Sequence, residues 1–324
     1  MLQRANAILL LAGTAVLAGC TPSREELIAS NQETVGRYCT TCHDDKTPEW
    51  AVGQMDQWWS DGDRRRAALM VADTMYRAGS GDATVLPQLA RLAVDRSQGM
   101  LVRASAVEFM EQLALGTAGM ASADAQSQTS FAKGGAPAAR VTSQPAKLSR
   151  AEVNALVGAA SDPEPTVRAR AVMALIATGE RDRIIPPLAA RLVDEARVVR
   201  MSAAEALLTL GIAELPGAVG EALSRAQDEY ADALQAFDDA PSNHSALGWL
   251  ESERGRVAEA TAALDRAIHL NPRAARPYVT KGVIAARRER FREAADLWRK
   301  ARDLEPSYPN IDRLIEEAEK RKSP

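Results

Sequence analysis

The chain has 324 residues, enough for two or three domains, and its formal net charge of −3 gives no electrostatic basis for binding nucleic acid. Apolar residues make up 46% of the chain, which is enough for a core, but aromatic residues make up only 4%. Helices packed through Ala and Leu have this composition, whereas β-sheets are rich in aromatic and β-branched residues. The composition therefore predicts an all-α protein.

Residues 1–20 have the pattern of a targeting segment. The positively charged Arg4 is followed by an apolar stretch over residues 5–17, which is short for a transmembrane span. The segment closes with the letters LAGC, which resemble the lipobox of bacterial lipoproteins and predict lipidation of Cys20. An ordinary signal peptide with a chance cysteine is the alternative. Lipidation predicts a protein anchored in the bacterial envelope, and Thr21 in place of Asp favours the outer membrane, facing the periplasm.

The next segment, 21–63, contains the letters CTTCH at residues 39–43, the spacing at which c-type haem is attached. The thiols of Cys39 and Cys42 would each bond one vinyl group of a single haem, and His43 would ligate the iron from the proximal side. The two cysteines could instead be a redox dithiol, a disulfide or part of a zinc site. A structural zinc site needs four ligands, and the chain has only three cysteines and three histidines. We therefore predict one covalent haem c in this segment.

The motif leaves the second iron ligand open, because no other histidine lies near it in the sequence. Lys46, a residue of a partner protein, a methionine or no ligand at all are the alternatives. The methionine candidates are Met55, Met70, Met75 and Met100. A methionine ligand would raise the reduction potential relative to two histidines, and a role in the apolar core is the competing interpretation for each. Thr47, an N-cap ahead of Pro48, predicts a helix that runs to about Ser60.

From residue 64 the pattern changes to helical pairs. Helices are expected at 64–78, 82–95 and 98–115, and together they form a HEAT-like block over 64–115. Residues 116–147 are poor in large apolar side chains and predict a flexible linker.

A second block over 148–237 shows a repeat. Residues 162–179 match 194–211 at an offset of 32, with a Val-Arg pair early in each copy and Gly at the end. This pattern resembles HEAT repeats. We expect Arg168 and Arg200, the arginines of the two pairs, to be solvated or paired with an acidic residue of a neighbouring repeat.

The C-terminal block, 238–324, has a period of 34 residues. Gly255-Arg256 begins a stretch that aligns with the one from Glu289-Arg290 at that offset. The period resembles tetratricopeptide repeats, with residues 307–321 as the capping helix that a solenoid end requires. His244 and His269 fall inside these repeats and are expected to be ordinary packing or surface residues.

The order of these segments resembles the C-terminal part of bacterial multihaem cytochromes c that carry HEAT and tetratricopeptide repeats. The resemblance covers residues from about 36 to 310 and is most specific over CTTCHDDKTPEWA, residues 39–51. It implies an α-solenoid with a small N-terminal c-type haem segment. The upstream haem motifs of that family are missing, so its functional residues carry over only to Cys39, Cys42 and His43.

Three functions fit these features. The first is a membrane-anchored periplasmic monohaem cytochrome that transfers single electrons and docks redox partner proteins on its repeats. The second is a structural or assembly scaffold in which the haem, or a disulfide, is mainly structural. The third is an open-site haem sensor or a peroxidase-like enzyme. No acid–base pair or nucleophile pattern favours catalysis, so an electron carrier or binding protein is the stronger prediction.

Overall fold

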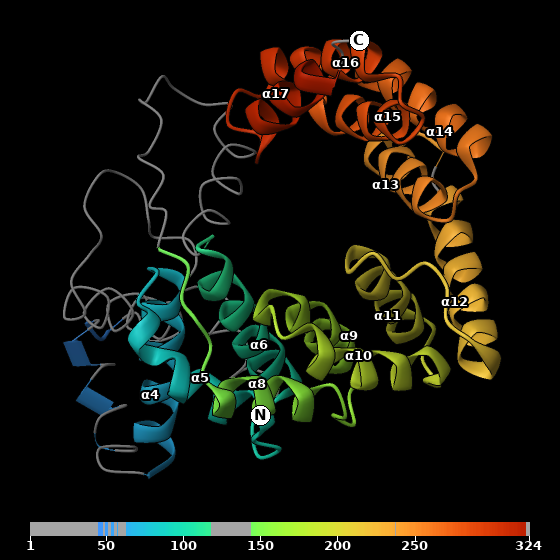
Figure 1. The fold of residues 1–324 in the computed structure, drawn as a ribbon. Coiled ribbons are helices and arrows are strands. Elements are labelled where there is room, and N and C mark those ends of the chain that lie inside the picture. The colour runs from blue at the N-terminus through green and yellow to red at the C-terminus, as the bar shows by residue number, and fades with distance from the viewer. Residues whose placement is uncertain are drawn as a thin grey trace. The chain divides into compact units, whose positions relative to one another are not determined.

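A computed structural model of the chain describes residues 45–47, 49, 50, 53, 54, 57, 63–117, 144–236 and 238–321. Every regular element in these ranges is a helix, which confirms the predicted all-α fold (Figure 1). The chain divides into two compact units, Met1–Ala159 and Ala160–Pro324. Among the helices described, none is both long and apolar enough to cross a membrane.

The described part of the first unit is a small helical bundle. Its helices are α4 (Asp63–Gly79), α5 (Leu86–Val94), α6 (Met100–Leu115) and α8 (Arg150–Ala159), with a short 3-10 turn, η2 (Ala83–Val85), before α5. Helix α5 packs against both α6 and α8, and α4 packs against α6. Helix α5 buries Leu86, Leu89, Ala90 and Ala93, a spacing that places all four side chains on one helix face.

Two helix starts in this unit are capped by side chains. The backbone N–H of Trp50 donates to the Thr47 hydroxyl at 3.3 Å, so the predicted N-cap is confirmed. Helix α8 begins with a capping box, in which the N–H of Ser149 donates to the Glu152 carboxylate at 2.6 Å and the N–H of Glu152 donates to the Ser149 hydroxyl at 3.4 Å. These bonds satisfy backbone donors that a helix start leaves without intrahelical partners.

The second unit is a stack of helices. They are α9 (Pro165–Ala174), α10 (Arg181–Ala190), α11 (Arg197–Thr209), α12 (Gly217–Gln235), α13 (Pro241–Glu253), α14 (Val257–Leu270), α15 (Ala275–Arg287), α16 (Phe291–Leu304) and α17 (Ile311–Arg321). The 3-10 turns η3 (Leu175–Thr178) and η4 (Arg191–Val193) follow α9 and α10. From α10 on, each helix packs against the next one along the chain, as the olive-to-red part of Figure 1 shows. Such nearest-neighbour packing is typical of a solenoid.

The two repeat periods recur in the helix bounds. Helices α9 and α11 begin at residues 165 and 197, and each repeat ends at a glycine, Gly179 or Gly211, with φ of 69° or 73°. Glycine adopts this left-handed backbone without strain, so it can stop each helix at the same point. The pair α13–α14 and the pair α15–α16 have bounds that differ by the 34 residues of the second period.

Each 34-residue pair crosses at a glycine. A Cβ atom on Gly282 would overlap the Trp298 ring, and one on Gly248 would overlap the Leu264 side chain. The Trp298 ring is fixed there, because its Nε1 donates to the Val279 carbonyl at 3.1 Å. The small residues seen in the period therefore let the two helices of each pair approach closely.

Charged side chains connect consecutive repeats. Arg168 pairs with Asp194 of the next repeat at 2.7 Å, and Arg200 pairs with Glu229 of α12 at 2.7 Å. The expectation that these arginines are solvated or paired with a neighbouring repeat is confirmed as pairing. In the 34-residue repeats, Arg287 pairs with Glu253, its counterpart one repeat earlier, at 2.8 Å.

Candidate functional site

The predicted attachment residues for haem, Cys39, Cys42 and His43, lie outside the described residues. The predicted lipidation site Cys20 and the ligand candidate Met55 also lie outside them. Haem attachment and lipidation therefore stay predictions from the sequence.

Lys46, another candidate ligand, has local partners. Its amino group pairs with the Asp45 carboxylate at 2.8 Å and lies 5.7 Å from the centre of the Trp50 ring. A lysine held over an aromatic ring is stabilised by the negative face of that ring. In this arrangement the amino group of Lys46 is engaged with residues of its own segment.

Two of the remaining methionine candidates are on the surface. The side chain of Met70 on α4 is 71% exposed and that of Met100 at the start of α6 is 43% exposed, while Met75 is half-buried. The competing interpretation as core residues is therefore wrong for Met70 and Met100. Met70 lies on the face of α4 opposite to the core, because Val71 and Thr74 are the neighbouring α4 residues that are buried.

The two histidines of the repeats have the ordinary roles expected for them. His244 is buried on α13, with its Nε2 atom 2.9 Å from the carbonyl oxygen of Asp238, and His269 is exposed on α14. Across the described ranges, no group of three His, Cys, Asp or Glu side chains is placed to hold a metal ion.

A half-buried polar pair joins α11 to α12. The Tyr230 hydroxyl hydrogen-bonds to the Glu205 carboxyl, and Arg276 of α15 lies close enough to act on both groups electrostatically. Burial raises the pKa of Glu205 above its ordinary value of 4.5, and the Tyr230 bond and the Arg276 charge oppose that rise. Burial and the Glu205 charge also raise the pKa of Tyr230. Tyr230 therefore stays protonated at neutral pH and can act as the donor.

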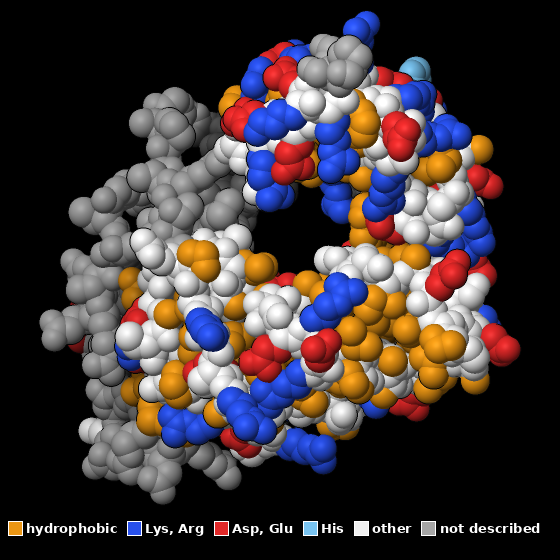
Figure 2. Space-filling model, viewed as in Figure 1, with side chains coloured by type: hydrophobic (Ala, Val, Ile, Leu, Met, Phe, Trp, Pro, Cys, Tyr) orange, Lys and Arg blue, Asp and Glu red, His pale blue; other side chains and the backbone are white. Residues whose placement is uncertain are grey.

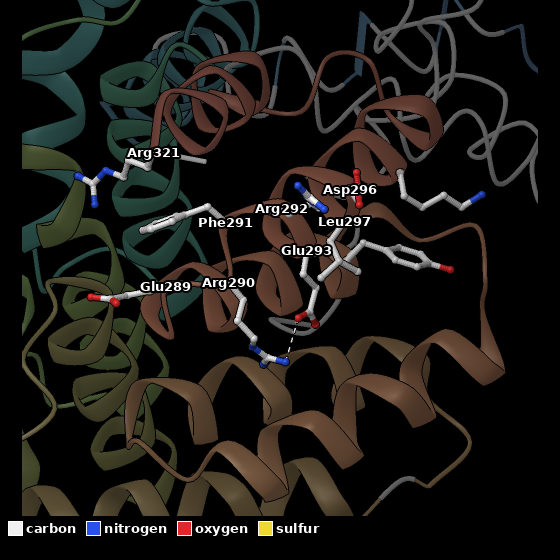
Figure 3. A pocket seen from close by; sticks show the side chains of 10 residues that line it. Glu289, Arg290, Phe291, Arg292, Glu293, Asp296, Leu297 and Arg321 are labelled. Carbon is white, nitrogen blue, oxygen red and sulfur yellow. Dashed lines mark ion pairs between the residues drawn. The ribbon is translucent and has the colours of Figure 1, made fainter. Parts of the chain in front are cut away.

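A surface depression lies along α16, with a volume of about 760 Å³. Its lining residues come from α15, α16, the loop between them and the end of α17: Tyr278, Glu289, Arg290, Phe291, Arg292, Glu293, Asp296, Leu297, Lys300 and Arg321. Figure 3 shows Phe291 and Arg321 at one end, and Arg290 turned toward Glu293. That ion pair measures 2.9 Å.

The helices around this depression are basic. Residues 275–304 contain nine Lys or Arg and only four Asp or Glu. Figure 2 shows Lys and Arg side chains gathered over the C-terminal helices. Residues 205–239, by contrast, contain one basic and eight acidic residues. The second unit therefore carries two segments of opposite charge, which is a basis for selecting a charged partner.

Sequence reasoning did not single out this surface. The formal charge of the whole chain, −3, hides it, because the acidic and basic segments nearly cancel. A count of charge by segment would have found the basic stretch at 275–304. The depression itself could not be predicted from the sequence, because it depends on the packing of α15, α16 and α17.

The comparison with protein families found a likeness to HEAT repeats. This family matches residues 145–208, a stretch that holds α8, α9, α10 and all but the last residue of α11. The described part of the chain is thus a helical-repeat scaffold with HEAT repeats in this stretch. No curated protein and no solved structure gave a match to the chain.

Proposed function

We propose that this chain is a lipid-anchored c-type cytochrome of the bacterial envelope, which carries one haem and docks redox partners on its helical repeats. The observation that carries the proposal is the CTTCH sequence at 39–43, within the segment that follows an LAGC sequence ending at Cys20. The second unit supports the docking part of the proposal, because stacked repeats present extended surfaces to other proteins.

In this proposal each residue has a separate role. Cys39 and Cys42 hold the haem through thioether bonds, and the imidazole of His43 binds the iron on one side. The bound haem would supply single-electron chemistry. Cys20 carries the acyl chains that hold the protein on the periplasmic face of a membrane, with the outer membrane favoured by Thr21.

The second ligand of the iron, if the chain supplies one, would be a methionine. Met70 and Met100 have exposed side chains on helices of the first unit, so their sulfur atoms are free of core packing. Substitution of each by Leu, a change close in volume, separates them. A variant that loses the ligand would show a lower potential, and if both variants keep the potential of the unaltered protein, neither Met70 nor Met100 is the ligand.

The test of the proposal is haem staining after denaturing electrophoresis. The unaltered protein, expressed with a competent maturation system, should stain, and the Cys39→Ala/Cys42→Ala variant should not. Cys20→Ala should move the protein from the membrane pellet to the periplasmic fraction. An unaltered protein that does not stain would overturn the haem assignment, and a Cys20→Ala variant that stays in the pellet after a salt wash would overturn the anchor.

The second candidate function is a scaffold that recruits an envelope protein without passing electrons. The observation that favours it is the ion pairing between repeats, which joins α9 to the start of the next repeat, α11 to α12, and α13 to α15. Reduced-minus-oxidised spectra separate the two functions. A haem that cannot be reduced and reoxidised by small mediators would favour the scaffold.

A further inference from the structure

The depression along α16 has three cations that are not neutralised by neighbours. Within the described residues, Arg292, Lys300 and Arg321 make no ion pair. The other lining cation, Arg290, is paired with Glu293. Each of the three lies exposed, and Arg292 and Lys300 are eight residues apart on one face of α16. Because no carboxylate of the described residues pairs with them, these three positive charges can attract an anion from outside the protein.

The carboxylates of the depression do not cancel this set. Asp296 pairs with Arg299 at 2.6 Å, and Glu293 pairs with Arg290 at 2.9 Å. Glu289, in the loop between α15 and α16, is the lining carboxylate that has no ion pair within the part of the chain that is described. Within the described residues, the lining therefore holds three cations and one carboxylate that make no ion pair.

Apolar side chains form the other part of the lining. Phe291, Leu297 and Tyr278 are half-buried, so each presents part of its surface to the depression. The Arg321 guanidinium lies 5.7 Å from the centre of the Phe291 ring. A cation held on a ring face is positioned before a ligand arrives, which lowers the entropic cost of binding.

We propose that this depression binds an acidic segment of a partner protein, with carboxylates at Arg292, Lys300 and Arg321 and an apolar side chain on Phe291 and Leu297. The inference rests on the proposed docking role of the repeats and names the chemistry of the partner. Carboxylate–guanidinium contacts are charge-assisted hydrogen bonds and suit arginine in particular.

A peptide segment fits these observations better than an anionic membrane surface. A membrane offers headgroup charge over a broad plane, whereas the depression is a concavity of about 760 Å³ with an apolar lining. Such a lining stabilises only a ligand that brings apolar atoms beside its carboxylates. The acidic stretch 205–239 of the same unit would repel an acidic partner, so the partner is steered to the basic end.

The test is a binding titration of the full-length holoprotein with a fluorescent twelve-residue peptide of alternating Glu and Leu, beside a peptide with Gln in place of every Glu. The double variant Arg292→Gln/Lys300→Gln should lower the affinity for the Glu peptide about tenfold or more, and added salt should lower that affinity further. The matched control is Arg225→Gln/Arg313→Gln, which removes two cations that are 67% and 68% exposed on α12 and α17. The control should change the affinity less than about twofold.

Each alternative result overturns the inference. Equal binding of the Gln peptide would mean that charge does not select the ligand. Equal losses in the double variant and its control would mean that the attraction is not local to the depression. With Cys20→Ala in both proteins to remove the proposed anchor, binding to vesicles of anionic phospholipid that the double variant abolishes, with no binding of the Glu peptide, would assign the surface to a membrane. Haem staining reports on the proposed function separately, so peptide binding can fail while the haem assignment stands, and the reverse.

Discussion

Arg168 on α9 and Asp194 at the start of the next repeat form a two-point contact across 26 residues of sequence. The Arg168 Nε and Nη2 atoms donate to the two Asp194 oxygens at 2.9 and 2.7 Å. The Arg168 Nη1 atom donates to the carbonyls of Asp162 and Pro163, both at 2.9 Å, in the turn before α9. Only 6% of the Arg168 side chain and 4% of the Asp194 side chain are exposed. One guanidinium therefore joins the turn of its own repeat to the turn of the next.

Arg168→Ala should lower the free energy of unfolding by about 3 kcal/mol, because it leaves the Asp194 carboxylate buried without its main partner. Burial alone would raise the pKa of Asp194, but the hydrogen bonds from Arg168 and the Ala196 N–H hold that pKa below its ordinary value. Urea unfolding followed by circular dichroism measures the loss. Arg225→Ala, in an exposed pair on α12, is the control and should stay within about 0.5 kcal/mol of the unaltered protein. Equal losses in both variants would contradict a local role for the Arg168 pair.

Glu205 gives the second unit a pH dependence of known sign. Its pKa is raised in the folded protein, so from about pH 4.5 upward the folded state keeps a proton that the unfolded chain releases. Stability contributed by this group is complete below pH 4.5 and is lost as the pH rises through the folded pKa. Glu205→Gln removes the titration, so the variant should gain stability relative to the unaltered protein as the pH rises.

Urea unfolding at pH 4 and pH 8 checks this expectation. Arg276→Gln, which removes the charge that lowers the pKa of Glu205, should have the opposite effect and make the loss at pH 8 larger. A difference between Glu205→Gln and the unaltered protein that is equal at both pH values would mean that Glu205 titrates as it does in the unfolded chain.

The sequence was informative where the signal is local. Helical periodicity, the Thr47 cap and the glycine ends at 179 and 211 depend on neighbours within a few residues, and the structure has them where they were expected. The sequence did not predict which residue pairs with Arg200. It is Glu229, 29 residues away on α12, and it follows from how α11 packs on that helix.

The surfaces depended on tertiary packing. The side chains of Met70 and Met100 are apolar, yet their exposure depends on which face of α4 or α6 the neighbouring helices cover. The depression along α16 likewise needs the end of α17 beside Phe291, and no spacing in the sequence predicts that contact.

Gly282→Ala should destabilise the second unit by roughly 1–3 kcal/mol, because the new methyl group would overlap the Trp298 ring. The ring cannot turn away without breaking its bond to the Val279 carbonyl. Gly158→Ala on α8 is the matched control, since a Cβ there would be 3.4 Å from Val94, an ordinary contact. That control should be neutral or stabilising, because Ala favours a helix over Gly. Thermal unfolding distinguishes the two variants. If the control loses as much stability as Gly282→Ala, the close helix crossing is not the cause of the destabilisation.

Helix α17 closes the stack through one apolar face. Ile311, Ile315 and Ala318 are buried against Trp298 and its neighbours, whereas the other face of α17 is charged. A solenoid end needs such a two-faced helix, because the last repeat has no further neighbour to cover it. Ile315→Ala removes buried atoms from this contact and should lower the free energy of unfolding by about 2–4 kcal/mol. Glu316→Ala, at the exposed position next to it, should stay within about 0.5 kcal/mol. Urea unfolding of both variants measures the difference. If Ile315→Ala costs no more than Glu316→Ala, α17 is not the helix that closes the stack.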